Sequence, residues 1–333
     1  MKGKVLSVGK FRGLSATSSA DKVFTILAFD HRHSFLRMLK PTPKEGEEYQ
    51  AVVTAKSDLV PILSPYGSAI LLDPVYSAAQ MIISGKLPGD IGLLVSVEAS
   101  GYTGDNTGRV SKILENWGVE KIKRMGANAV KLLIYYHPDA GKVAEEQEKL
   151  VSKVVEDCRK HDIPLFVEAV SYSIDPRIDK KSQEFAAGHP DVVVETARRL
   201  GPLGPEILKL EFPVQPEFDS DESHWLEACQ AVSEASPTPW AVLTGGVTYE
   251  VFVEQLEIAC KGGASGFLAG RAVWQESMSM SRDERRDWLE KVAVQRLQEL
   301  AAIAEDFARP WTDFYPPQDV AEYENWYASY KKE

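Results

Sequence analysis

The stretch EILKLEFPV, from Glu206 to Val214, is an apolar run that carries a single lysine, Lys209. A lysine is rarely buried without a partner or a chemical role. Side chains of a strand alternate between its faces, so Lys209 and Glu211 would both point into a barrel or a two-sided sheet. Two interpretations follow: Lys209 is a nucleophile, or Lys209 and Glu211 form a structural ion pair.

Seven further apolar runs have the length of strands and alternate with segments of helical character. Eight strands alternating with helices predict an α/β fold, the (β/α)8 or TIM barrel, whose active site lies at the carboxyl ends of the strands. An open doubly wound sheet is the alternative, but no GxGxxG or Walker A motif follows the first run. The seven runs are 23–29 (VFTILAF), 68–72 (SAILL), 91–97 (IGLLVSV), 128–136 (NAVKLLIYY), 163–170 (IPLFVEAV), 239–243 (PWAVL) and 264–269 (ASGFLA).

The runs divide the chain into a polar lead-in (1–22), a barrel (23–308) and a C-terminal aromatic extension (309–333). Aromatic side chains dominate interfaces, so we expect the extension to pack on the barrel or on another subunit; the alternative is a flap over the site. Helices are expected at 36–56 with a break at two prolines, and at 111–125, 144–160, 191–200 and 280–307.

Composition excludes several classes of protein. The net charge of −11 and the pI near 5.2 argue against nucleic acid or an anionic membrane as the main partner. No apolar stretch reaches the roughly 18 residues that a membrane span needs, and the start resembles no secretory signal. Cys158, Cys229 and Cys260 form no CxxC spacing, which suits a reducing compartment. We therefore expect a cytoplasmic protein.

Charged residues gather at the ends of the predicted strands. Asp30 ends the first run, Glu168 lies near the end of the fifth, and a second lone lysine, Lys131, lies within the fourth. Asp73 and Glu98 also follow strands, and for these two a structural cap is as good an interpretation as a catalytic role.

The last two runs end in turns suited to an anion. Thr244, Gly245 and Gly246 follow the seventh run, and Gly270 and Arg271 follow the eighth. Glycines allow the backbone to approach an anion, and arginine offers a charged fork for phosphate. Barrel enzymes often hold a phosphate between these two loops.

The histidines offer a competing interpretation. His31 and His33 could bind zinc together with a third ligand, as a metal-dependent enzyme would require. The other four histidines show no paired spacing, so we predict no metal and no cofactor.

Seven stretches of the chain, in order, carry a resemblance to a known family: LAFDHR (27–32), SPYGSAILLDPVY (64–76), GANAVKLLIYY (126–136), IPLFVEAVSY (163–172), ILKLEFPV (207–214), LTGGV (243–247) and GASGFLAGRAVW (263–274). From about residue 24 to 274 the chain resembles the class I tagatose-1,6-bisphosphate aldolases, and its last stretch is also similar to the sulfofructose-phosphate aldolases.

The resemblance implies cleavage of a ketose bisphosphate through a Schiff base on Lys209, with Glu168 as acid and base. Lowering a lysine pKa from about 10.4 to about 7 costs roughly 4 to 5 kcal/mol, which burial and a second cation, Lys131, could supply. Asp30 would pair with the lysines or orient the substrate. Arg271 would bind the C1 phosphate, together with the three residues Gly270, Gly245 and Gly246 and the hydroxyl of Thr244.

Two departures leave the substrate open. This chain has Thr244-Gly245 where the family commonly has serine followed by alanine or serine, and His31 where it usually has glutamine. Arg32 and His31 would hold the second anion, a phosphate or a sulfonate. The resemblance implies a sugar phosphate as substrate and a homo-oligomer; sulfofructose 1-phosphate is the alternative substrate, and a non-catalytic sugar-phosphate sensor the alternative function.

Overall fold

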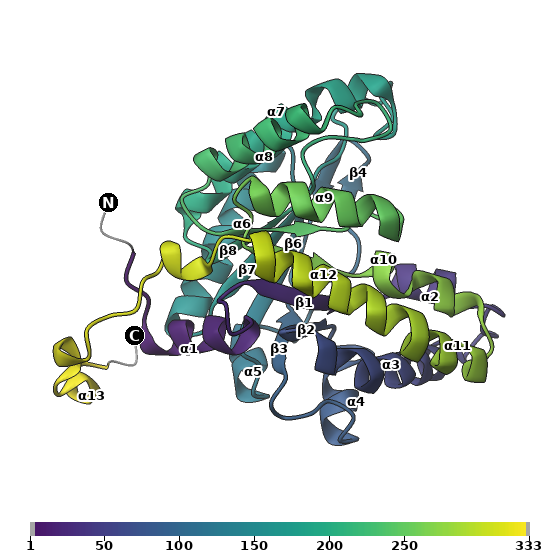
Figure 1. The fold of residues 1–333 in the computed structure, drawn as a ribbon, viewed down its shortest axis with the longest axis horizontal. Helices are drawn as coiled ribbons and strands as arrows, with labels where there is room; N and C mark the ends of the chain where they lie inside the picture. The colour runs from purple at the N-terminus through teal and green to yellow at the C-terminus, as the bar shows by residue number, and fades with distance from the viewer. Residues whose placement is uncertain (1–3, 331–333) are drawn as a thin grey trace.

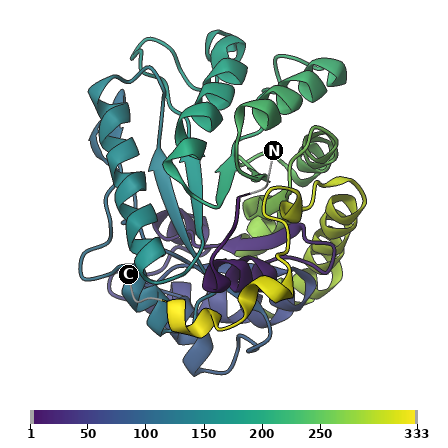
Figure 2. The same ribbon diagram turned by 90° about the vertical axis from the view of Figure 1, so that its left-hand side faces the viewer.

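The computed structural model describes residues 4–330, in which eight parallel strands close into a barrel (Figures 1 and 2). Around the barrel the strands follow the order β1-β10-β9-β8-β7-β6-β3-β2. Each predicted apolar run contains one of these strands, so the predicted (β/α)8 fold is confirmed. The strands are β1 (Phe24–Phe29), β2 (Ala69–Leu72), β3 (Gly92–Ser96), β6 (Ala129–Tyr135), β7 (Leu165–Val170), β8 (Ile207–Leu210), β9 (Trp240–Leu243) and β10 (Gly266–Ala269).

Alternating residues of these strands fill the interior of the barrel. One cluster of buried side chains contains Phe24, Ala129, Phe166 and Ile207, together with inward-facing residues of the other strands. Phe24 and Phe166 meet edge to face, with ring centroids 5.3 Å apart. Because the side-chain period of a strand is two, the next inward positions of β6, β7 and β8 are Lys131, Glu168 and Lys209.

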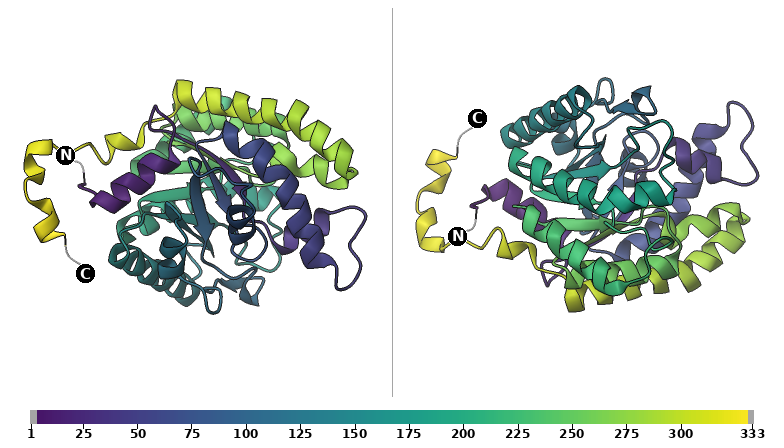
Figure 3. Two further views of the ribbon diagram at one scale, coloured as in Figure 1. Left: turned by 90° about the horizontal axis from the view of Figure 1, so that it is seen from below. Right: turned by 90° about the horizontal axis from the view of Figure 1, so that it is seen from above.

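Helices cover the outside of the barrel, where the opposite faces of the strands and the apolar faces of the helices form a second, larger core (Figures 1 and 3). No helix in residues 4–330 has the length and apolarity that a membrane crossing requires. The helices are α2 (His33–Met38), α3 (Glu48–Leu63), α4 (Ala78–Ile83), α5 (Val119–Arg124), α6 (Lys142–Lys160), α7 (Gln183–Leu200), α8 (Glu222–Ala235), α9 (Tyr249–Lys261), α10 (Arg271–Trp274), α11 (Arg282–Trp288) and α12 (Val294–Phe307).

The predicted helix at 111–125 is wrong in its first half. A small antiparallel hairpin, β4 (Thr103–Asp105) and β5 (Gly108–Val110), follows β3, and the chain then runs back along the barrel. The Leu114 amide donates to the Val97 carbonyl at 3.0 Å, which holds this segment extended. Helix α5 therefore begins only at Val119.

The other predicted helices are confirmed with shifted ends. The prolines divide the segment 36–56 between α2 and α3, and a π-helical turn at 289–293 joins α11 to α12. Helix α7 begins at Gln183, eight residues before the predicted start at Asp191, because the side chain of Ser182 caps its first turn.

The lead-in and the aromatic extension close the amino-terminal end of the barrel. Helix α1 (Val8–Thr17) lies there, and Trp311 and Tyr315 are buried against the interior cluster. Tyr315 donates a hydrogen bond to the carbonyl of Glu206, just before β8, at 3.0 Å. In Figure 1 the chain continues to α13 (Trp326–Ser329) at this same end. Burial of Trp311 and Tyr315 confirms the packing interpretation for this part of the extension, and a flap over the site is wrong for the described residues.

Candidate functional site

Three adjacent strands place the predicted catalytic side chains side by side. Lys131 lies on β6, Glu168 on β7 and Lys209 on β8, and all three are buried. In the register of the sheet Glu168 is the direct neighbour of Lys209. This position on the inner face, near the carboxyl ends of the strands, is where barrel enzymes carry their chemistry.

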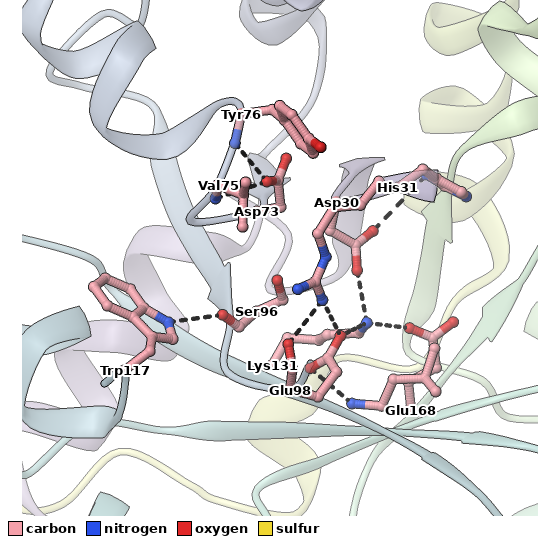
Figure 4. Close-up of polar contacts among 12 residues, drawn as sticks. Asp30, His31, Asp73, Val75, Tyr76, Ser96, Glu98, Trp117, Lys131 and Glu168 are labelled. Carbon is pink, nitrogen blue, oxygen red and sulfur yellow. Dashed lines mark hydrogen bonds and ion pairs between the residues drawn. The ribbon is translucent and has the colours of Figure 1, made fainter. Parts of the chain in front are cut away.

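Lys131 lies at the centre of three carboxylates (Figure 4). Its Nζ lies 2.6 Å from Oδ2 of Asp30, 2.8 Å from Oε1 of Glu98 and 2.9 Å from Oε2 of Glu168. Burial alone would lower the pKa of Lys131, but these carboxylates outweigh it and hold the pKa well above its usual value. Lys131 therefore carries a fixed positive charge.

Lys209 contacts the other oxygen of the same glutamate. Its Nζ lies 3.0 Å from Oε1 of Glu168, so this carboxylate bridges the two lysines. Burial would raise the pKa of Glu168, but Lys131 and Lys209 together lower it. The carboxylate is thus ionised and lies within reach of a proton on either amine.

The alternative interpretation of Lys209, an ion pair with Glu211, is wrong. Glu211 instead receives hydrogen bonds from the ammonium of Lys180 at 2.6 Å and from the amide of Ser171 at 2.7 Å. It lies just beyond the end of β8, where the chain leaves the sheet and the strand alternation no longer fixes the direction of its side chain. Glu211 therefore ties the loops after β7 and β8 together.

Asp30 follows β1 and joins the site through Lys131. Its carboxylate also lies 3.9 Å from Nδ1 of His31. Burial would raise the pKa of Asp30, but Lys131 and Lys209 lower it well below the usual range. The structure therefore places Asp30 against the fixed charge of Lys131.

Glu98 is the residue whose role the sequence left open, and it belongs to this cluster. Besides Lys131, it accepts a hydrogen bond from the amide of Leu133 at 3.1 Å. Arg32 is committed to the same residue: its Nη2 donates to the Glu98 carbonyl at 2.8 Å and lies 3.6 Å from Oε1. These contacts give Arg32 a role in holding Glu98, and its proposed contact with a second anion stays a prediction.

Asp73 lies outside the cluster (Figure 4). Its carboxylate accepts hydrogen bonds from the amides of Val75 at 2.8 Å and Tyr76 at 2.7 Å, and pairs with the buried Lys56. All of these contacts are local to the loop after β2 or to the neighbouring helix α3. Asp73 is therefore a structural cap.

The predicted anion-binding residues come together at the ends of β9 and β10. Gly245 and Gly246 have φ of +57° and +88°, and the Val247 amide closes the turn on the Thr244 carbonyl at 3.1 Å. A Cβ on Gly246 would lie 2.9 Å from Nη2 of Arg271, and the positive φ of this residue also favours glycine. The Nε of Arg271 is buried without a hydrogen-bond partner among residues 4–330.

His31 lies beside this turn. A Cβ on Gly270 would lie 2.9 Å from Cε1 of His31, and the imidazole meets the ring of Trp274 edge to face. Burial lowers the pKa of His31 to about 4, with Arg271 and Lys209 adding to the shift and Asp30 opposing it. The imidazole is therefore neutral at physiological pH.

The zinc interpretation finds no ligand set in the described part of the chain. Residues 4–330 contain no group of three or more histidine, cysteine, aspartate or glutamate side chains arranged to hold a metal. His33 begins α2 and is exposed, whereas His31 packs on Trp274. The centre of the carboxylate cluster is occupied by the ammonium of Lys131.

Comparisons with known proteins agree with this geometry. Residues 24–276 match the model of the DeoC/LacD family aldolases. Tagatose 1,6-diphosphate aldolase 2 of Streptococcus pyogenes serotype M3 (strain MGAS315) is 32% identical over 320 residues, covering 89% of this chain and 94% of the relative. Tagatose 1,6-diphosphate aldolase 1 of S. pyogenes serotype M1 is 33% identical over 314 residues, covering 87% and 94%.

Solved structures share the fold. An archaeal fructose-1,6-bisphosphate aldolase, solved with its catalytic lysine bound to the carbinolamine intermediate, superposes with a TM-score of 0.57 at 19% identity, covering 88% of this chain and 98% of its own. The family model matches most of the chain, and the curated relatives align over nearly their whole length. The chain therefore belongs to the DeoC/LacD family of aldolases.

Proposed function

We propose that this protein is a class I aldolase that cleaves tagatose 1,6-bisphosphate or a similar ketose bisphosphate to dihydroxyacetone phosphate and glyceraldehyde 3-phosphate. The observation that carries the proposal is the carboxylate of Glu168 held between Lys209, at 3.0 Å, and Lys131, at 2.9 Å. This arrangement provides a nucleophile, a proton acceptor and a fixed cation within one contact of each other.

The first half of the reaction forms the Schiff base. Glu168 first takes a proton from the ammonium of Lys209, which it contacts at 3.0 Å. The neutral amine then attacks the ketose carbonyl at C2, and the resulting carbinolamine loses water when Glu168 returns that proton to the leaving hydroxyl. The product is a protonated imine on Lys209. Lys131 keeps its own proton throughout, because three carboxylates surround it, and its positive charge polarises the substrate hydroxyls.

The second half breaks the carbon skeleton. Glu168 removes the proton of the C4 hydroxyl, the C3–C4 bond breaks, and its electron pair moves into the imine to give an enamine. Glyceraldehyde 3-phosphate leaves. Protonation of C3 and hydrolysis of the imine then release dihydroxyacetone phosphate and restore the amine of Lys209.

We assign the C1 phosphate to the two neighbouring loops that follow β9 and β10. Positive φ at Gly245 and Gly246 exposes backbone there, and Arg271 presents a guanidinium whose buried Nε has no partner in the described chain. Gly270 and the Thr244 hydroxyl complete this assignment. A phosphate oxygen would accept a hydrogen bond from the buried Nε of Arg271.

Two further proposals concern the setting of the reaction. Cys158, Cys229 and Cys260 are buried free thiols, which supports a reducing compartment such as the cytoplasm. Tyr327 on α13 is 70% exposed, and Trp326 and Tyr330 are also exposed, which supports a homo-oligomer with the extension at its interface. Sedimentation of the full chain and of a chain ending at Pro316 tests this: loss of the oligomer only on truncation supports it.

Borohydride trapping tests the proposed chemistry. Wild type and Lys209→Met are incubated with dihydroxyacetone phosphate and borohydride, and the intact mass is measured. We expect a stable adduct on wild type, mapped to Lys209, and none on the variant. If wild type binds the ligand without forming an adduct, the protein is a sugar-phosphate sensor; loss of turnover in a chelator would instead restore the zinc mechanism.

The identity of the sugar is tested separately. Tagatose 1,6-bisphosphate is compared with sulfofructose 1-phosphate, which would give dihydroxyacetone phosphate and 3-sulfolactaldehyde. We expect the higher kcat/KM for the bisphosphate, in keeping with the tagatose-bisphosphate aldolases that align with the chain. A higher value for the sulfonate would replace the proposed substrate while leaving the Schiff-base chemistry intact.

A further inference from the structure

The hairpin formed by β4 and β5 places Arg109 among three tyrosine rings. The Cζ of Arg109 lies 4.7 Å from the ring centroid of Tyr102, 5.3 Å from that of Tyr172 and 5.6 Å from that of Tyr135. Tyr135 is the last residue of β6. Tyr172 follows β7 by two residues. The guanidinium therefore lies at the carboxyl ends of the two strands that carry Lys131 and Glu168.

The hairpin lies at the same end of the molecule as the anion-binding turn. Figure 1 shows β4 toward the end where α2 and α10 lie, away from α1 and α13. The pKa of Tyr135 is affected by charged groups of both the hairpin and the site. Burial raises the pKa of Tyr135, Arg109 and Lys131 lower it, and Glu168 raises it further.

Arg109 has no carboxylate partner in the described part of the chain. Its Nε donates to the carbonyl of Asn106 at 3.2 Å, and residues 4–330 place no acid within ion-pair distance of its guanidinium. Other cations at this end are committed: Arg32 to Glu98 and Lys180 to Glu211. In a chain with a net charge of −11, a half-buried arginine held by aromatic rings and one backbone carbonyl, with no paired acid in the described residues, is well suited to an anionic ligand.

The barrel order sets Arg109 opposite Arg271. Arg271 follows β10, and four steps along the order, through β9, β8 and β7, lead to β6. Four steps in a barrel of eight strands are half of the circumference. The two guanidinium groups therefore lie on opposite sides of the barrel mouth, with Lys209 and Glu168 on the strands between them.

We propose that Arg109 binds the second anion of the substrate, the one remote from the C1 phosphate. This inference rests on the proposed aldolase function and assigns to Arg109 the contact that the sequence assigned to Arg32 and His31. A ketose chain with an anion at each end would span the mouth from Arg271 to Arg109, with its carbonyl over Lys209. The chemical class recognised is a tetrahedral oxyanion, phosphate or sulfonate, held by the fork of the guanidinium.

Binding measurements on a protein that cannot turn over test the proposal. In the Lys209→Met background, calorimetry gives Kd for tagatose 1,6-bisphosphate and for tagatose 1-phosphate, which lacks the second anion. We expect Arg109→Gln to reduce the preference for the bisphosphate about 10- to 100-fold, as befits loss of one charge-assisted contact. Arg109→Lys, which keeps the charge and loses the fork, should fall between the two.

Arg177→Gln is the matched control. Arg177 lies in the loop after β7 at the same end of the barrel, and its side chain is 86% exposed and paired with Asp175. The control should keep the preference of the Lys209→Met protein. Equal weakening of both ligands by Arg109→Gln would show a structural role only, and an unchanged preference would show no contact; either result overturns the proposal.

The Kd comparison tests the role of Arg109 separately from the proposed aldolase function. Borohydride trapping with dihydroxyacetone phosphate uses a ligand with one anion and reports on Lys209 alone. Failure of trapping removes the aldolase chemistry, whereas failure of the Kd comparison removes only the role of Arg109. Repeating the comparison with sulfofructose 1-phosphate distinguishes the two anions: the anion whose ligand loses more affinity in Arg109→Gln is the one that the guanidinium selects.

Discussion

Lys209 and Glu168 are direct neighbours across two parallel strands, and Nζ of the lysine lies 3.0 Å from Oε1 of the glutamate. The register of the sheet therefore fixes this contact, and neither side chain depends on a loop for its position. Since the second oxygen of Glu168 contacts Lys131 at 2.9 Å, the same carboxylate feels both a fixed cation and the amine that has to lose its proton.

Replacement of Glu168 by glutamine should remove the proton acceptor while retaining the shape of the side chain. We expect kcat to fall by about 10²- to 10⁴-fold, the usual contribution of a general acid or base. Steady-state kinetics measure the change, and circular dichroism verifies the fold. Glu217→Gln, an exposed glutamate in the loop after β8, is the control. Wild-type turnover in Glu168→Gln would remove the assignment.

Glu98 and Asp73 form a matched pair of buried carboxylates, each bonded to a buried lysine. Glu98 holds Lys131 inside the site, whereas Asp73 holds Lys56 outside it. We expect Glu98→Gln and Asp73→Asn each to lower the free energy of unfolding by about 1 to 3 kcal/mol. Only Glu98→Gln should also lower kcat, by about tenfold, because Lys131 loses one of the contacts that orient it.

Urea unfolding and steady-state kinetics on the same two variants measure both effects. A fall in kcat of similar size in Asp73→Asn would show that the loss reflects general loosening of the barrel. Unchanged kcat in Glu98→Gln would mean that Asp30 and Glu168 alone position Lys131.

His31 should make the stability of the protein depend on pH. Its pKa is lowered to about 4 in the folded protein and is about 6.5 in an unfolded chain, so the unfolded state binds the extra proton first. The contribution of His31 to stability is therefore complete above pH 6.5 and is lost as the pH falls from 6.5 to 4. Because 22% of the side chain remains exposed, we expect a loss of about 1 to 2 kcal/mol between pH 7 and pH 5.

His31→Gln should remove that part of the pH dependence. Urea unfolding at pH 7 and pH 5 measures it, and His33→Gln, at an exposed position two residues on, is the control. If His31→Gln and wild type lose the same free energy between these pH values, the imidazole is not held neutral by the fold.

Much of the barrel was predictable because parallel strands buried on both faces appear in the sequence as continuous apolar runs. Within such a run a single lysine, as at 131 or 209, stands out against its neighbours. The carboxylate partners were harder to predict. Glu98 follows its strand just as Asp73 does, and only the three-dimensional arrangement of β3 beside β6 brings one acid to Lys131 while the other meets Lys56.

The sequence pattern indicated neither the β4–β5 hairpin nor a role for Arg109. Strands of three residues, as in β4 and β5, are too short to show a period of two, and the segment 99–110 is polar and rich in glycine. The rings around Arg109 come from three separate parts of the chain, at positions 102, 135 and 172. A contact of this kind depends on how the loops fold over the barrel and becomes visible only in three dimensions.

The aromatic extension should affect stability and leave substrate affinity unchanged. Trp311 is fully buried beneath the barrel, at the end remote from Lys209, so Trp311→Ala should lower the free energy of unfolding by about 3 to 5 kcal/mol. The KM for the bisphosphate should stay at its wild-type value at a temperature where the variant is folded. Ile83→Ala, at a position 87% exposed outside the extension, should change stability by less than about 0.5 kcal/mol. Thermal unfolding and initial rates on the two variants separate the alternatives: a raised KM with unchanged stability in Trp311→Ala would mean that the extension reaches the substrate.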